Sequence, residues 1–167
     1  CRILGGEPFV NKKIHKVLDK LLTFRSISRV VVYTNGTIVP KGDNLACLID
    51  DRVVIDITDY GALSRNYDKL KQTLLDNKIK FVTKVPRWTD SGRILDKQDR
   101  TEEELNNLFL NCCVNDVLTL LNGKLYRCPF SANATNLCAI PDDSTDYVDL
   151  TSYSSHGNLF ENISNLY

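Results

Sequence analysis

The sequence predicts an α/β fold on a parallel sheet, followed by a small β-hairpin extension. Three observations support this prediction. Strand-like apolar runs alternate with helical patterns along the first half of the chain, two of these runs are continuous and β-branched, and the connections are short. Continuous Val/Ile-rich runs are typical of strands covered on both faces of a parallel sheet. Short connections of this kind favour right-handed crossovers.

Four strands are expected in the first half of the chain, over residues 2–4, 29–33, 52–57 and 80–84. The first helix follows Asn11, which we expect to be its N-cap. Its apolar positions follow a spacing of 0, 3, 4, 7 and 8, which marks one helical face; they are Ile14, Val17, Leu18, Leu21 and Leu22. His15 lies off that face and is expected in solvent.

Three further helical segments are expected. Residues 43–48 form a short helical connection, and a longer helix follows Ser64, its expected N-cap. Another helix opens at Thr101, which forms a capping box with Glu104. The last helix has one apolar face, made of Leu105, Leu108, Phe109, Cys112 and Cys113.

The pattern changes after Cys112. Residues 117–121 and 124–128 flank Asn122-Gly123, which is the strongest short signal for a hairpin with a type I′ turn. We therefore expect three parts: a partial barrel over residues 1–111, the hairpin extension over 112–141, and a polar tail over 142–167. Within the tail, residues 147–150 are expected to return as a strand.

Composition excludes some partners. The 21 Lys and Arg cancel the 21 Asp and Glu, which removes the electrostatic case for a nucleic acid or a polybasic membrane contact. No apolar run approaches the roughly 18 residues of a spanning helix, so we expect a cytoplasmic protein. The sequence has no Met and starts at Cys1, so we expect it to be a piece of a longer protein.

Three expected strands end in polar, glycine-bearing turns. These are the GGEP loop (residues 5–8), the TNGT loop (34–37) and the TDYG loop (58–61). The carboxyl ends of parallel strands are where α/β folds bind ligands. A carboxylate such as Glu7 can hold an ammonium, and Asn35 or Asp59 can bond ribose hydroxyls. We predict a small-molecule site there. The alternative is that these are ordinary turns, which also favour Gly, Asn and Asp.

Over residues 2–92, roughly, the chain resembles radical S-adenosylmethionine (radical SAM) enzymes. The run from Leu4 to Pro8 looks like their GGEP motif, and the TNGT loop is similar to their "TNG" strand end. The TDYG loop takes the place of the strand end that contacts ribose in that family. The resemblance implies a partial (β/α)6 barrel that binds S-adenosylmethionine. The residues implied to bind the cofactor are Gly5, Gly6, Glu7, Pro8, Thr34, Asn35 and Asp59.

The hairpin region resembles the start of a SPASM/Twitch extension, which binds an auxiliary iron–sulfur cluster in relatives. The matching pattern is Cys113, nine residues, Gly123, four residues and Cys128. The resemblance implies Cys113, Cys128 and Cys138 as metal ligands, and thiolates suit Fe–S iron. Zinc is a lesser alternative. Cys113 also continues an apolar helix face, so packing as a buried thiol is the competing interpretation. Trp88 resembles part of a substrate-facing loop in the same relatives, or packs against the helices.

The family's C-x3-C-x2-C loop, which precedes its GGEP strand, does not occur in this sequence. In the family it holds the [4Fe–4S] cluster that reductively cleaves S-adenosylmethionine to a 5′-deoxyadenosyl radical, with flavodoxin or ferredoxin as reductant. The resemblance therefore implies a parent enzyme of the oxidoreductase or activase type. We expect this chain alone to be inactive and to carry no cofactor. Residues 2–4 would form an unpaired edge that favours pairing with a second copy.

Two other classes of protein stay open. One is a non-catalytic nucleotide- or metal-binding module that uses the same strand ends. The other is a thiol-stapled interaction domain with Cys112 joined to Cys113 and Cys128 joined to Cys138. Three cysteines spaced C-x3-C-x2-C in the upstream gene sequence would favour the enzyme, and six free thiols would exclude the stapled domain.

Overall fold

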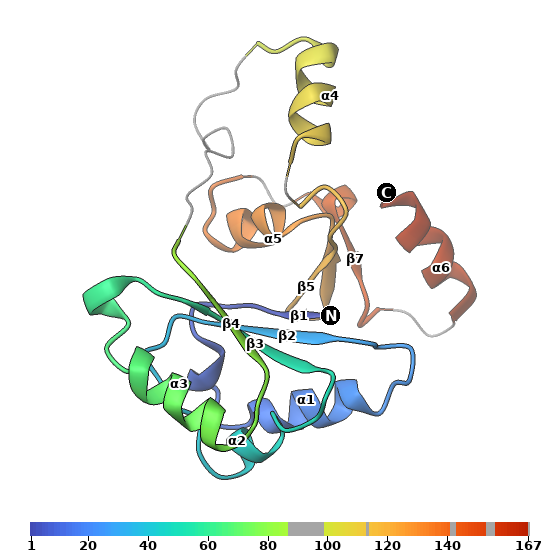
Figure 1. Cartoon of the computed structure of the whole chain (residues 1–167). Coiled ribbons are helices and arrows are strands. Elements are labelled where there is room, and N and C mark those ends of the chain that lie inside the picture. Colours follow the sequence, from blue (N-terminus) through green and yellow to red (C-terminus); the bar gives the residue numbers. More distant parts are fainter. Residues whose placement is uncertain (87–98, 113, 141–142, 153–155, 167) are drawn as a thin grey trace. The chain divides into compact units, whose positions relative to one another are not determined.

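The computed structural model describes residues 1–86, 99–112, 114–140, 143–152 and 156–166 (Figure 1). The chain forms two compact units, Cys1–Trp88 and Thr89–Tyr167. The helix that the sequence analysis assigned to the first module, α4 (Glu102–Leu110), therefore belongs to the second unit. Helical periodicity shows that a face is apolar, but it does not show which part of the chain that face belongs to.

The first unit contains one four-stranded parallel sheet, as predicted. Its strands follow the chain in order, β1-β2-β3-β4. They are β1 (Arg2–Ile3), β2 (Val30–Thr34), β3 (Val53–Thr58) and β4 (Phe81–Lys84). Each strand therefore lies beside the one that precedes it in the sequence. This order is compatible with a partial β/α fold of the predicted kind. Strand β1 is short and lies at an edge of this sheet.

Helices α1, α2 and α3 lie on the same side of the sheet (Figure 1). The helical segments of the unit are η1 (Pro8–Val10), α1 (Ile14–Leu22), α2 (Asp43–Ala46), η2 (Gly61–Leu63) and α3 (Tyr67–Asp76). Both expected N-caps were wrong, because the N-cap positions of α1 and α3 are occupied by Lys13 and Asn66, and neither side chain makes a capping hydrogen bond. Asn11 instead ends η1, and Ser64 ends η2.

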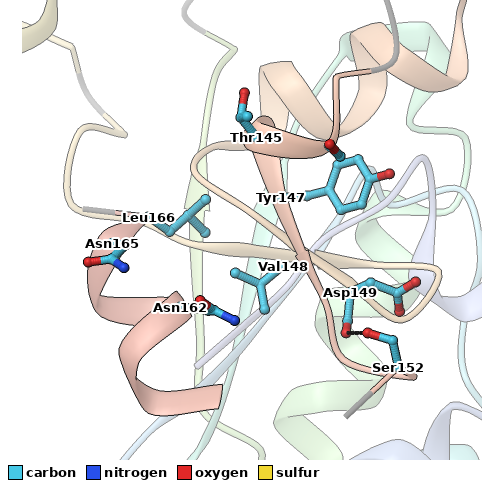
Figure 2. A pocket seen from close by; sticks show the side chains of 9 residues that line it. Thr145, Tyr147, Val148, Asp149, Ser152, Asn162, Asn165 and Leu166 are labelled. Carbon is cyan, nitrogen blue, oxygen red and sulfur yellow. Dashed lines mark hydrogen bonds between the residues drawn. The ribbon is translucent and has the colours of Figure 1, made fainter. Parts of the chain in front are cut away.

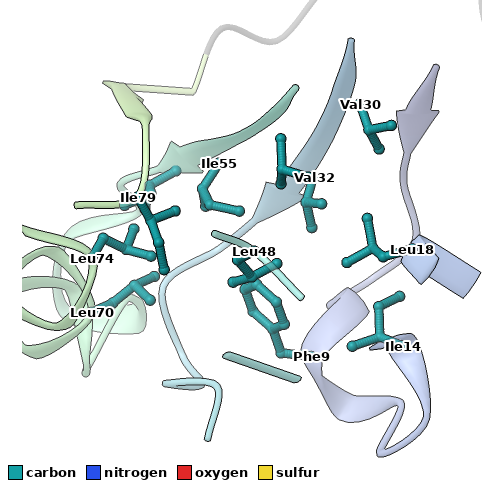
Figure 3. Packing of buried hydrophobic residues seen from close by; sticks show 12 residues of the cluster. Phe9, Ile14, Leu18, Val30, Val32, Leu48, Ile55, Leu70, Leu74 and Ile79 are labelled. Carbon is teal, nitrogen blue, oxygen red and sulfur yellow. The ribbon is translucent and has the colours of Figure 1, made fainter. Parts of the chain in front are cut away.

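The core of the first unit lies between the sheet and these helices (Figure 3). Side chains alternate between the two faces of a strand, so Val30 and Val32 on β2 share a face with Ile55 on β3. From the helices, Leu18 and Leu74 complete the cluster and are fully buried. This packing fixes the strands beneath the loops that follow them.

Two polar side chains near the helices make specific contacts. His15 is half-buried, and its Nδ1 lies 2.7 Å from Asn44 Oδ1, so the expectation that it is simply solvated was wrong. The pattern of the helix could not show this contact, because Asn44 lies 29 residues further along the chain. Cys47 packs at the edge of the core cluster, with its Sγ 3.5 Å from Asn44 O.

Burial raises the pKa of the Cys47 thiol to about 11, and repulsion from Asp19 and Asp43 adds to the rise. We expect iodoacetamide at pH 8 to alkylate folded Cys47 roughly 100-fold more slowly than an ordinary thiol, because the thiolate is the nucleophile. Peptide mapping by mass spectrometry measures the rate, with exposed Cys138 as the control. Equal alkylation rates at Cys47 and Cys138 would contradict the burial of Cys47.

The raised pKa of Cys47 also makes stability depend on pH. The folded pKa lies above the unfolded value, so this thiol favours the native state below about pH 9, and that contribution is lost as pH rises through 11.

The second unit contains an antiparallel sheet of order β5-β6-β7. Its elements are α4, β5 (Thr119–Leu121), β6 (Lys124–Tyr126), α5 (Pro129–Asn136), η3 (Ser144–Asp146), β7 (Tyr147–Asp149) and α6 (His156–Asn165). The hairpin prediction is confirmed: Asn122 and Gly123 have φ of 51° and 79°, as a type I′ turn requires. The capping box of Thr101 with Glu104 and the returning strand of the tail are also confirmed.

Helix α6 was not predicted, because the tail was interpreted from its polar composition. Its spacing nonetheless carries a signal. Leu159, Ile163 and Leu166 are separated by four and three residues, and all three are at least partly buried. No helix in the described ranges has the length and apolar character needed to cross a bilayer.

Candidate functional site

The Glu7 carboxylate joins the GGEP loop to the TNGT loop. Thr34 Oγ1 donates to it and lies 3.0 and 2.8 Å from its two oxygens, and the backbone N–H of Asn35 donates at 2.9 Å. Within its own loop, Glu7 also accepts from the N–H of Phe9 at 3.1 Å, which caps η1. Hydrogen bonds to a charged acceptor are stronger than neutral ones, so this group, here called the Glu7 clamp, is a strong link between the ends of β1 and β2.

The Asn35 side chain continues this connection. Its Nδ2 lies 3.4 Å from Gly6 O, and its Oδ1 accepts from Thr37 N at 3.0 Å and from Thr37 Oγ1 at 2.6 Å. Gly36, between them, has φ of +72°, a conformation that favours glycine. The TNGT loop is thus fixed by its own side chains as well as by Glu7.

Ser64 joins the third loop to the second. Its buried hydroxyl donates to Asn35 O at 2.6 Å and accepts from the N–H of Tyr60 at 2.9 Å. In the same TDYG loop, Asp59 Oδ1 accepts from the N–H of Gly61 at 2.8 Å. One network of hydrogen bonds therefore connects all three strand-end loops.

A pocket of about 250 Å³ opens at this network, lined by Gly6, Asn35, Thr37, Tyr60 and Leu63. Its size is slightly below the roughly 300–1,000 Å³ typical of drug-sized ligands. The lining combines polar backbone and amide groups with apolar surface from Tyr60 and Leu63. This composition suits a ligand that has both polar groups and a flat or apolar part.

The predicted cofactor residues take different places in this arrangement. Gly6 and Asn35 line the pocket, whereas Glu7 and Thr34 lie in the clamp that holds the loops together. Pro8 begins η1 and is buried, Gly5 has φ of +150°, and Asp59 fixes the TDYG turn. Both oxygens of Glu7 already accept hydrogen bonds from the protein. A direct contact of Glu7 with a ligand ammonium stays a prediction.

The sequence analysis placed Thr37 and Tyr60 in the loops of the predicted site but gave them no role, and it missed Leu63 and Ser64. Two signals were present. Leu63 is an apolar residue beside a glycine turn and is exposed in the structure, and Ser64 lies three residues after the end of the third loop. Ser64 was interpreted as a helix cap because Ser commonly takes that position.

The predicted metal ligands are described only in part. Cys128 and Cys138 are free thiols, and Cys128 Sγ accepts from the N–H of Ser131 at 3.4 Å. Cys113 and Trp88 lie outside the described residues. In the part of the chain that the structure describes, no three His, Cys, Asp or Glu side chains come together as a metal site. The auxiliary ligand set therefore stays a prediction, while the Cys128–Cys138 disulfide is not present.

A second pocket, of about 360 Å³, lies within the second unit between β7 and α6 (Figure 2). Its lining includes Tyr147, Asp149, Asn162 and Asn165. Asp149 is already engaged, because its Oδ1 accepts from Thr151 N at 2.9 Å and Thr151 Oγ1 at 2.6 Å. These two bonds hold the pKa of the carboxyl below its usual range. The pocket offers hydroxyl and amide groups as possible ligand contacts.

No protein-family model matches the chain, and neither a curated protein nor a solved structure shows significant similarity to it. The fold and the site define a class only: an α/β protein with a pocket at the carboxyl edge of a parallel sheet.

Proposed function

We propose that this chain is part of a radical SAM enzyme and binds S-adenosylmethionine in the pocket at the carboxyl edge of β1, β2 and β3. The observation that carries the proposal is the network of the strand-end loops. Three motifs that resemble family motifs in their order along the chain also meet in space, joined by the Glu7 clamp and Ser64. Sequential parallel strands with helices on one side support the same proposal.

The pocket residues fit part of this cofactor. Among the described residues, the Gly6 carbonyl accepts one long contact, 3.4 Å from Asn35 Nδ2, so it retains capacity to accept from the ammonium of the methionine moiety. Tyr60 and Leu63 provide apolar surface for the adenosine moiety. The pocket of about 250 Å³ holds only a portion of the molecule, so the remainder would extend past its rim.

The residues present do not fit the catalytic cluster. The six cysteines, at positions 1, 47, 112, 113, 128 and 138, include no C-x3-C-x2-C spacing. The electron that cleaves S-adenosylmethionine comes from that cluster and its reductant in the family, so we assign only cofactor binding to this chain.

The missing cluster loop led to the expectation that this chain carries no cofactor. The connected loops and their pocket lead us instead to propose that the full chain binds S-adenosylmethionine, and we expect Leu63→Arg to weaken that binding at least tenfold. Leu63 lines the pocket and is 74% exposed, so a long cation there blocks the pocket without disturbing the core, and repels the positively charged sulfonium. Isothermal titration calorimetry measures the affinity. Leu75→Arg is the matched control, because Leu75 is also an exposed leucine but lies near the end of α3, away from the pocket lining.

Three outcomes decide whether the chain binds S-adenosylmethionine at this pocket, does not bind it, or is a non-catalytic nucleotide-binding module. Binding that Leu63→Arg weakens and Leu75→Arg does not would support the proposal. Absence of measurable binding to the wild-type chain would refute cofactor binding by these residues. Equal affinity for ATP and S-adenosylmethionine would instead favour the non-catalytic nucleotide-binding module.

A further inference from the structure

The dipeptide Asn-Gly occurs twice in the sequence, once in each unit. Asn35-Gly36 lies in the TNGT loop, and Asn122-Gly123 forms the turn between β5 and β6. Asparagine is chemically labile, and it reacts with its own backbone most readily when glycine follows it. Glycine has no side chain to hinder the attack, and its backbone is free to turn toward the asparagine. The same chemistry is therefore present in two structural settings.

The reaction requires only water. The backbone nitrogen of the glycine attacks the side-chain carbonyl carbon of the asparagine and forms a new C–N bond. The side-chain nitrogen then leaves as ammonia, which takes the proton of the glycine N–H. Water opens the resulting succinimide ring at either of its carbonyl carbons. One product is aspartate, and the other is isoaspartate, in which the backbone continues through the side-chain carbonyl.

Hydrogen bonds hold Asn35 away from this reaction. Its Nδ2 lies 3.4 Å from Gly6 O, and its Oδ1 accepts from Thr37 N at 3.0 Å and from Thr37 Oγ1 at 2.6 Å. The attacking nitrogen is also engaged, because the Gly36 N–H donates to Thr34 Oγ1 at 3.2 Å. Gly36 is buried, so the backbone of this loop has little room to rearrange into a ring.

Asn122 has none of these restraints within the described part of the chain. It is exposed at the tip of the hairpin, and its side chain makes no hydrogen bond with a described residue. The Gly123 N–H likewise donates to no described residue. The succinimide ring has a fixed geometry, so the turn must open locally before the ring can close. Such opening costs least where few contacts hold the backbone, as at this tip.

We propose that Asn122 is a site of spontaneous deamidation, and that isoaspartate formation there opens the β5–β6 hairpin. A type I′ turn joins its strands through two residues, and its twist matches that of the strands. Isoaspartate lengthens the backbone of this turn by one carbon atom, so the turn no longer holds the strands in register. The Gly123 carbonyl accepts from Leu150 N at 2.9 Å, so the change also reaches the end of β7. The proposal concerns the second unit and does not depend on S-adenosylmethionine binding.

The rates are measured by peptide mapping with mass spectrometry on the full chain aged in mildly alkaline buffer. Deamidation changes the mass of a peptide by the difference between water and ammonia. We expect Asn122 to react at least tenfold faster than Asn35 in the folded chain. In concentrated guanidinium chloride we expect similar rates, because only the fold distinguishes the two sites. Comparable rates in the folded chain, or reaction of Asn122 in the denaturant alone, would overturn the proposal.

Asn122→Asp separates the new charge from the longer backbone. Asp-Gly is also a preferred type I′ sequence, so we expect this variant to keep the amide protection of the wild-type hairpin. Chromatography of the aged chain isolates the isoaspartate form. In that form we expect at least tenfold faster hydrogen exchange at the amides of Leu121 and Lys124, which pair beside the turn. Wild-type protection in the isoaspartate form, or equal loss of protection in Asn122→Asp, would refute opening by the longer backbone.

Discussion

Glu7→Gln is expected to lower the free energy of unfolding of the first unit by roughly 2–4 kcal/mol, since hydrogen bonds to charged groups contribute about 1.5–3 kcal/mol each. The wild-type carboxylate accepts from Thr34 Oγ1, Asn35 N and Phe9 N. Glutamine has only one acceptor oxygen, so its NH₂ must face at least one of these donors. We expect the TNGT loop to separate from the GGEP loop as a result.

Amide hydrogen exchange in the full chain is the measurement, because it reports the two units separately. We expect faster exchange at the amides of β2 and β3 in Glu7→Gln, and no comparable change within β5–β7. Asp51→Asn is the control, since Asp51 is an acid of the same unit that has its side chain in solvent. Unchanged protection of β2 in Glu7→Gln would show that the clamp does not stabilise the unit.

Leu74→Ala is expected to destabilise the first unit by roughly 2–5 kcal/mol, the range for a buried leucine truncated to alanine. Leu74 is fully buried among the side chains between α3 and the sheet, as Figure 3 shows. Truncation removes its contacts and leaves a cavity that a packed core fills only in part. Because folded proteins are stable by only about 5–15 kcal/mol, this one change removes a large fraction of the stability.

Leu75→Ala is the matched control for this prediction. It removes the same atoms from the next residue of α3, but Leu75 is 57% exposed. We expect its effect to stay within about 0.5 kcal/mol, as for surface substitutions generally. Urea unfolding, again followed by exchange of the β2 and β3 amides, gives both values. Equal effects of the two substitutions would contradict the packing of α3 described above.

The strands and the hairpin could be predicted because their signals are local. Val30 to Val32 and Val53 to Ile55 are β-branched runs, and Asn122-Gly123 fixes the turn type through backbone conformation. Helix caps were less predictable. Asn11 and Ser64 have suitable side chains, but each ends a 3₁₀ turn instead. A cap depends on the path of the chain as well as on the residue.

The location of the candidate site could be predicted from the sequence, but the hydrogen bonds that hold its loops together could not. The rule that ligands bind at the carboxyl ends of parallel strands led to the three loops. It could not indicate that Glu7 would be used to hold Thr34 and Asn35, because that depends on how two distant loops face each other.

The links between successive strands have a consequence for how the first unit can form. Glu7 reaches Thr34 across 27 residues, Ser64 reaches Asn35 across 29, and Lys84 reaches Asp56 across 28. Each link therefore closes a ring of nearly the same size, and the entropy lost on closing a ring changes only slowly with its length. Assembly can then proceed strand by strand along the chain, with each added segment secured to its predecessor at a similar entropic cost.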